Sequence, residues 1–163
     1  MIRNRSGLIV AGMVLALGTV WAEPAGKEAA ANAAAAIFSA TNAPPVLSER
    51  EKAAVKAAER WLQSVDEGDY AKAWQVAAPF FQKTVTLEQW EQKMQTLRKP
   101  LGKLVSRTCT RAVYRTKMTG APEGEYVSIT FEASFENKAA AIERVGIKLE
   151  AEGTWMGSGY FIK

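Results

Sequence analysis

Histidine is absent from this chain of 163 residues, and cysteine occurs only once, at Cys109. Without histidine the chain cannot build Ser-His or Cys-His nucleophile pairs, imidazole proton shuttles or the zinc sites that need imidazole ligands. A single cysteine excludes a disulfide framework within the chain and cysteine-rich metal clusters. Glycine-rich phosphate loops, dinucleotide-binding motifs and calcium loops are also missing. We therefore predict neither a metal nor a cofactor.

The first residues have the three parts of a secretory signal peptide. Arg3 and Arg5 supply a positive start, the uncharged run from Leu8 to Val20 follows, and Ala22 ends a cleavage-site pattern. The run is shorter than the about 20 residues needed to span a bilayer, although an uncleaved anchor is the alternative. We predict a signal peptide over residues 1–22, no stable membrane span after cleavage near Ala22, and a mature protein in the periplasm or secreted.

Cleavage would also change the charge of the chain. It would remove Arg3 and Arg5 and no acidic residue, so 21 basic residues against 17 acidic ones become 19 against 17. The formal net charge then falls from +4 to +2. Such a small charge gives no electrostatic basis for binding nucleic acid or an anionic membrane surface. We therefore predict no nucleic-acid partner.

Alanine dominates the stretch from Glu23 to Leu47, which also contains Pro44 and Pro45. Alanine favours helix, but this stretch has few large side chains to bury. We interpret residues 23–47 as an Ala/Pro-rich linker or disordered arm, with a transient helix as the alternative. Residues 48–163 are predicted to form a single domain.

Three helices are predicted in the first half of this domain, because apolar residues recur there at helical spacing. Each begins at a residue whose side chain can accept a hydrogen bond from an amide of the first turn, and each stops at Gly or Pro. The predicted starting and stopping residues are, in order, Ser48 and Gly68, Asp69 and Pro79, and Thr86 and Pro100. Ser48 with Glu51, and Thr86 with Gln89, form capping boxes.

After Gly102 the apolar pattern changes from helical to alternating, which indicates strands. The predicted strands are 104–117, 126–135, 144–152 and 154–162. From Tyr126 to Phe135 the odd-numbered residues are apolar and most even-numbered ones are polar, so one face of the sheet is predicted to be buried. Three N-terminal helices packed on a four-stranded antiparallel sheet make an α+β fold.

Short stretches, taken in their order along the chain, resemble a bacterial exported family catalogued as domain of unknown function 4019. The stretches that carry the resemblance are Trp61-Leu62, Val65-Asp66, Gly68-Asp69-Tyr70, Trp74, Gln89-Trp90, Arg98-Lys99-Pro100-Leu101-Gly102, Ser106-Arg107, Ala121-Pro122-Glu123-Gly124-Glu125-Tyr126, Ser134-Phe135 and Gly159-Tyr160-Phe161-Ile162. The resemblance covers residues 53–163. It implies an exported bacterial protein with no assigned activity and a cone-like fold of the nuclear-transport-factor-2-like or cystatin-like kind. Such folds host both enzymes and binding modules, so the resemblance does not decide the function.

A basic series runs along the predicted first strand, at Arg107, Arg111 and Arg115. Because even separations keep side chains on one face of a strand, the three arginines are predicted to share a face. Together they could bind a carboxylate or phosphate ligand. The alternative is a solvated face on which they pair with acids of neighbouring strands, namely Glu132, Glu150 and Glu152.

Tryptophan is abundant in the predicted mature chain, at positions 61, 74, 90 and 155. These rings could line an apolar ligand pocket between helices and sheet, or they could simply fill the core. If the domain binds a ligand, the residues predicted to contact it are Trp74, Trp90, Arg107, Tyr126 and Tyr160.

Asp66, Asp69 and Tyr70 form an acid–phenol cluster around the predicted turn at Gly68. In an enzyme, a buried carboxylate could remove a proton while the phenol stabilises an oxyanion. Asp69 is equally explained as an N-cap, and Asp66 as an exposed residue beside a helix end. We predict no catalytic residue. If the protein is instead an enzyme, this cluster would supply its catalytic residues.

Cys109 lies among threonines and arginines of the predicted first strand. The neighbouring arginines could lower the pKa of its thiol, an unpaired cysteine in an exported protein could join a homodimer, or the side chain could be a half-buried structural thiol. The sequence leaves the three open.

Taken together, these patterns favour a non-catalytic domain that binds a small molecule or an envelope protein in the bacterial cell envelope. The alternative is a His-free isomerase or hydrolase-like enzyme with an Asp/Tyr pocket. The two differ in one observable, because an enzyme needs an acid with a raised pKa inside a pocket, whereas a binding domain needs only a lined cavity.

Overall fold

The computed structural model describes residues 45–163. The predicted signal peptide, and all but the last residues of the predicted linker, lie outside the described residues. The described elements are α2 (Glu49–Asp66), α3 (Tyr70–Gln75), α4 (Pro79–Thr84), α5 (Leu87–Leu97), the 3-10 helix η1 (Lys99–Leu101), β1 (Leu104–Arg115), β2 (Glu125–Phe135), β3 (Lys138–Leu149) and β4 (Trp155–Ile162).

The helix ends are set by local chemistry, as predicted. Ser48 and Glu51 form a capping box at the start of α2, and Thr86 and Gln89 form one at the start of α5. At the end of α2, Gly68 has a φ of 78°, and the backbone amides after the helix bond back to its last carbonyls, which is a Schellman ending. The capping boxes and the glycine stop are confirmed.

The predicted count of three helices is wrong, because the described residues contain four α-helices. We predicted that Pro79 would only stop the second helix. That helix instead ends at Gln75, and Pro79 opens the additional short helix α4. Proline lacks the amide hydrogen that the first helical position leaves unused, and its fixed φ suits a helix start.

The strands form one antiparallel sheet in the order β1-β2-β3-β4, which confirms the α+β class and the four-stranded antiparallel sheet. The odd-numbered residues of β2 from Val127 to Phe135 are buried, so the predicted buried face is confirmed. β3 begins at Lys138, earlier than predicted, and therefore places Glu143 within the sheet.

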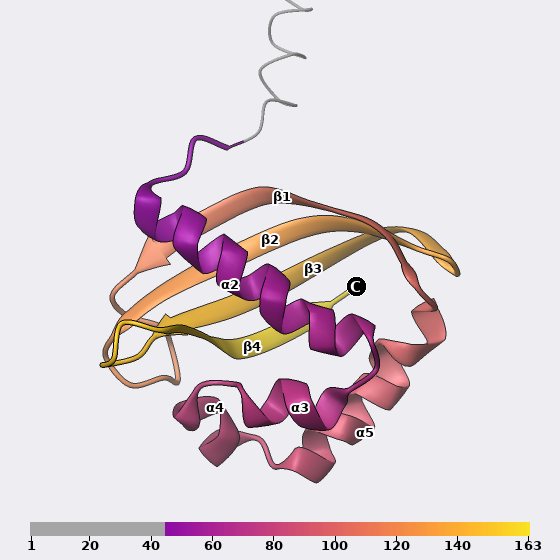
Figure 1. Ribbon diagram of the computed structural model, residues 1–163, viewed down its shortest axis with the longest axis horizontal. Helices are drawn as coiled ribbons and strands as arrows, with labels where there is room; N and C mark the ends of the chain where they lie inside the picture. The colour runs from indigo at the N-terminus through magenta and orange to yellow at the C-terminus, as the bar shows by residue number, and fades with distance from the viewer. Residues whose placement is uncertain (1–44) are drawn as a thin grey trace, which may run out of the picture. The chain divides into compact units, whose positions relative to one another are not determined.

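The helices lie on one side of this sheet (Figure 1). α2 crosses the face and contacts all four strands, α4 contacts β4, and α3 packs against α5. The side chains of Trp61, Phe81, Trp90 and Tyr160 meet between the helices and β4. This layer is the hydrophobic core.

The opposite side of the sheet carries even-numbered side chains of β2 and β3, and no described helix packs on it (Figure 1). The turn after β1 covers one end of this side, where the hydroxyl of Tyr126 donates to the backbone oxygen of Pro122 at 2.7 Å. We call this side the open face. In the part of the chain that the structure describes, no helix is long and apolar enough to cross a membrane.

Candidate functional site

β1 contains an irregularity that separates its arginines. Arg107 pairs with Ala133 and lies on the helix-covered side, but the register shifts between Cys109 and Arg111. An extra residue in one strand reverses the side that later residues face. Arg111, opposite Thr130, and Arg115, opposite Tyr126, therefore lie on the open face. The prediction that the three arginines share one face is wrong.

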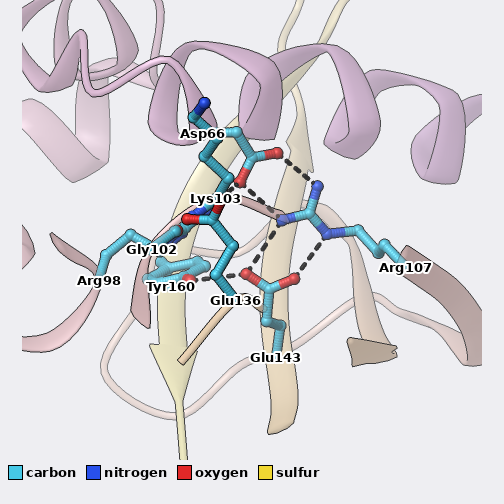
Figure 2. A network of polar contacts seen from close by, with 8 residues as sticks. All are labelled: Asp66, Arg98, Gly102, Lys103, Arg107, Glu136, Glu143 and Tyr160. Atoms are coloured by element: carbon cyan, nitrogen blue, oxygen red, sulfur yellow. Dashed lines mark hydrogen bonds and ion pairs between the residues drawn. The ribbon is translucent and has the colours of Figure 1, made fainter. Parts of the chain in front are cut away.

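Arg107 joins two carboxylates that come from different elements (Figure 2). Its Nη1 and Nη2 donate to Oδ2 and Oδ1 of Asp66, at the end of α2, at 2.7 and 3.0 Å. Its Nε and Nη2 donate to Oε2 and Oε1 of Glu143, on β3, at 2.6 and 3.2 Å. The side chain of Glu143 is fully buried and that of Arg107 is 9% exposed. These paired bonds tie α2 to two strands of the sheet.

Tyr160 and Arg98 complete this arrangement, which we call the buried charge network (Asp66, Arg98, Arg107, Glu143 and Tyr160). The hydroxyl of Tyr160 donates to Oε1 of Glu143 at 2.7 Å. Nη2 of Arg98 donates to Oδ1 of Asp66 at 2.9 Å, and its Nη1 donates to the backbone oxygen of Gly102 at 2.7 Å. The guanidinium carbon of Arg98 also lies 4.2 Å from the centre of the Phe135 ring.

The protonation of two network members follows from their surroundings. Burial alone would lower the pKa of Arg107, but the hydrogen bonds and charges of Asp66 and Glu143 outweigh it and raise that pKa above its ordinary value. Burial, and then the negative charge of Glu143, raise the pKa of Tyr160 well above its ordinary value. Arg107 therefore stays charged, and Tyr160 stays a neutral hydrogen-bond donor.

Both carboxylates of the network are occupied by donors of the protein itself. Each oxygen of Asp66 and of Glu143 accepts at least one hydrogen bond from an arginine or from Tyr160. A general base needs a lone pair directed at its substrate. Within the network, Nε of Arg98 is the buried polar atom without a partner. The network therefore has the geometry of a structural ion-pair network that connects α2 to β1 and β3.

The aromatic side chains beside the network are packed against one another. The rings of Trp61 and Trp90 stack with centres 5.7 Å apart, and Tyr160 meets Trp90 edge-on at 6.2 Å. Nε1 of Trp90 donates to the backbone oxygen of Tyr70 at 3.0 Å. These side chains fill this part of the space between helices and sheet.

The five residues predicted to contact a ligand do not form one cluster. Arg107, Trp90 and Tyr160 lie on the helix-covered side, within or beside the network. Trp74 is partly buried in α3, and its Nε1 donates to the backbone oxygen of Val85 at 2.8 Å. Tyr126 is buried under the turn on the open face. Ligand contact by these residues stays a prediction.

The acid–phenol cluster is also divided. Asp69 is exposed and caps α3 by accepting from the amide of Lys72 at 3.0 Å, as predicted. Asp66 is not the exposed helix-end residue that we expected, because its side chain is 18% exposed and paired with two arginines. Tyr70 is buried, and burial raises the pKa of its hydroxyl.

Sequence reasoning missed Glu143 and Arg98. Glu143 has a detectable signal, since it stands in phase with the apolar residues Ala141, Val145 and Ile147 of the same strand. A charged side chain at an inward strand position needs a buried partner. Arg98 has no such signal, because its burial depends on the turn through η1 that follows α5.

The open face is hollowed where the even-numbered side chains are small. A recess of about 590 Å³ is lined by residues of β1, β2 and β3 and by Lys163, including Ser106, Thr108, Ser134 and Ala140. A second recess of about 270 Å³, beside Met118 and Phe161, lies on the same face. A third, of about 290 Å³, opens between α2 and β4. Neither Asp66 nor Glu143 lines any of these three recesses.

Five basic side chains lie on the open face. Lys138 and Lys163 line the large recess and Arg144 lines the second, while Arg111 and Arg115 of β1 lie on the same face without lining either recess. The predicted ion pairs of the β1 arginines with Glu132, Glu150 and Glu152 are absent among the described residues, where Glu150 pairs with Lys148 instead. No described carboxylate lies within ion-pair distance of these five side chains.

Cys109 lies on the helix-covered side of β1 and is partly buried against the core. Burial raises the pKa of its thiol. The register shift places Arg111 on the open face, so of the two arginines that we expected beside the thiol, Arg107 shares its side of the sheet and Arg111 does not.

Helices on one side of a four-stranded antiparallel sheet, tied to it by a buried charge network, define the class of this protein. Over residues 57–160 the chain matches the family described as a protein of unknown function (DUF4019). The chain therefore belongs to this family. No curated protein and no solved structure matched the chain.

Proposed function

We propose that this protein is an exported bacterial binding domain of the cone-like, nuclear-transport-factor-2-like kind, which holds a partner protein of the cell envelope on its open face. One contrast carries the proposal. On the helix-covered side every carboxylate oxygen of the network has a donor, whereas on the open face five basic side chains have no described acidic partner. Unsatisfied charge beside a recess favours binding there.

Export is supported by the sequence of residues 1–22. Two arginines, a short uncharged apolar run and an alanine-ended cleavage pattern favour secretion to the periplasm or beyond. The folded residues then meet envelope proteins rather than cytoplasmic ones.

A protein partner is favoured over a small ligand inside the cone because large side chains already occupy the core beside the network. Trp90 is 1% exposed and Tyr160 is 6% exposed, and both make ring contacts on the helix-covered side. The occupied carboxylates of Asp66 and Glu143 argue against the enzyme alternative in the same way, since neither has a free oxygen directed at a recess.

Site-specific photo-cross-linking tests this function. A benzoylphenylalanine residue is placed at Thr108 or Ala140, which line the large recess, and the protein is irradiated in cells of the bacterium that encodes it. We expect a discrete protein adduct from both positions, because a partner seated on the open face covers them.

The matched controls carry the same cross-linker at Lys56 in α2 or Lys93 in α5, which are exposed on the helical side. We expect no adduct from these positions. Adducts formed only at Lys56 and Lys93, or at none of the four positions, would contradict a partner on the open face.

A further inference from the structure

We propose that the open face recognises an extended acidic peptide segment of its partner, with acidic side chains held by Arg111 and Arg144. This inference rests on the proposed function and names the chemistry of the partner.

Arg111 and Arg144 stand on either side of one residue of the central strand. Arg111 of β1 and Arg144 of β3 are both paired with Thr130 of β2. Neighbouring strands are about 4.8 Å apart, so the two Cα atoms are about 10 Å apart and their side chains point to the same side. Arginine side chains of this reach can donate to one carboxylate placed above Thr130, and such bonds are frequently bidentate.

Both arginines are available for such a contact. Both are exposed, and neither has a described carboxylate within ion-pair distance. Arg107 of the same strand differs, because it is buried and already bound to Asp66 and Glu143. Because of the register shift in β1, Arg107 faces the helices and pairs within the fold, whereas Arg111 faces the open side and is available to a partner.

Positive charge continues along the face in both directions. Arg115 lies beyond Arg111 on β1, and Lys138 and Lys163 border the large recess. The acids of this face are Glu132, which is opposite Thr108 and lines the large recess, and Glu150, which is paired with Lys148. Basic groups spread over several strands suit a ligand with repeated negative charges better than a single small anion.

Apolar surface lies between these charges. Ile142 lines the large recess together with alanines of β3. Phe161, the cross-strand neighbour of Arg144, is 47% exposed beside the second recess. A peptide whose acidic and apolar side chains both face the sheet supplies both kinds of contact, whereas inorganic polyphosphate has no apolar group for the recesses. In an extended chain such side chains lie two residues apart, because successive side chains point to opposite sides.

Fluorescence anisotropy with a defined probe tests the inference. The probe is a fluorescein-labelled peptide of about twelve residues with the repeat Glu-Ser-Leu-Ser, which places Glu and Leu in turn on one side of an extended chain and is long enough to cross the face. We expect it to bind the wild-type chain, with binding weakened by about 0.5 M salt because the contacts are ionic. The double variant Arg111→Gln/Arg144→Gln is expected to lose affinity for the peptide by about tenfold or more, because it lacks the charge-assisted hydrogen bonds.

The control double variant, Lys56→Gln/Lys93→Gln, removes the same charge from the helical side. We expect it to bind the probe as the wild type does. A far-UV circular dichroism spectrum and a thermal midpoint, measured for both variants, check that each is folded.

Three results would overturn the inference. These are no binding of the peptide to the wild-type chain, equal weakening by the two double variants, and inorganic polyphosphate binding as tightly as the peptide. Each of them leaves the proposed function testable, because cross-linking from Thr108 and Ala140 reports a partner on the open face whatever its chemistry.

Discussion

The pairing of Arg107 with Asp66 and Glu143 is a balance of large opposing terms. Removing charged groups from water costs several kcal/mol for each ion, and the attraction between them repays this only when the hydrogen bonds are well formed. Here the guanidinium donates to both carboxylates at 2.6–3.2 Å. Loss of one partner would leave the others charged and buried, so each member is required by its neighbours.

Replacing Tyr160 by Phe tests the network at neutral and alkaline pH. The variant loses the bond to Glu143, which costs about 1–3 kcal/mol of the free energy of unfolding at pH 8 because the acceptor is charged and buried. The pKa of Tyr160 is raised in the folded state, so the wild type keeps this contribution below the ordinary tyrosine pKa of about 10 and loses it as the pH rises further. At about pH 11 the advantage of the wild type shrinks by about 1.4 kcal/mol.

Urea unfolding of the wild type and the Tyr160→Phe variant at both pH values measures this difference. Tyr70 and Tyr126, whose pKa values are also raised by burial, are present in both proteins and cancel in the comparison. An advantage of the wild type that is the same at pH 8 and pH 11 would contradict the placement of Tyr160.

At the scale of elements, the sequence predicted the features that depend on residues close together in the chain. The capping residues of α2 and α5 and the alternation of β2 need only neighbours in sequence. The register shift after Cys109 is different, because it is defined by pairing with residues of β2 about twenty positions away. Counting even separations therefore placed Arg107 and Arg111 on one face, although the sheet divides them.

The contact between α2 and β4 makes a second prediction at this scale. A Cβ atom at Gly157 would lie 2.5 Å from ring carbons of Trp61, whereas at Gly159 it would meet nothing within 4 Å. We expect Gly157→Ala to lower the free energy of unfolding by about 1–3 kcal/mol, because Trp61 must move within a packed core. Gly159→Ala is the matched control, and thermal or urea unfolding measures both. Equal stability of the two variants would show that α2 does not approach β4 so closely.

At the scale of the whole molecule, the two sides of the sheet have separate roles. On the helix-covered side the charged groups of the buried charge network are paired with one another. The open face instead exposes Arg111 and Arg144 to solvent. The α+β class followed from the sequence, because it needs only the order of elements. The network did not, since Asp66, Arg107 and Glu143 are far apart in the chain and meet only in the fold.

The central claim is that binding occurs on the open face and not within the helix-covered core. Nuclear magnetic resonance of the ¹⁵N-labelled protein, titrated with the acidic peptide probe, tests it most directly by reporting every backbone amide and every indole N–H. We predict shift changes centred on Arg111, Thr130 and Arg144, with the indole signals of Trp61 and Trp90 unchanged. Changes centred on those two indoles and on Tyr160, or no changes at all, would contradict the account.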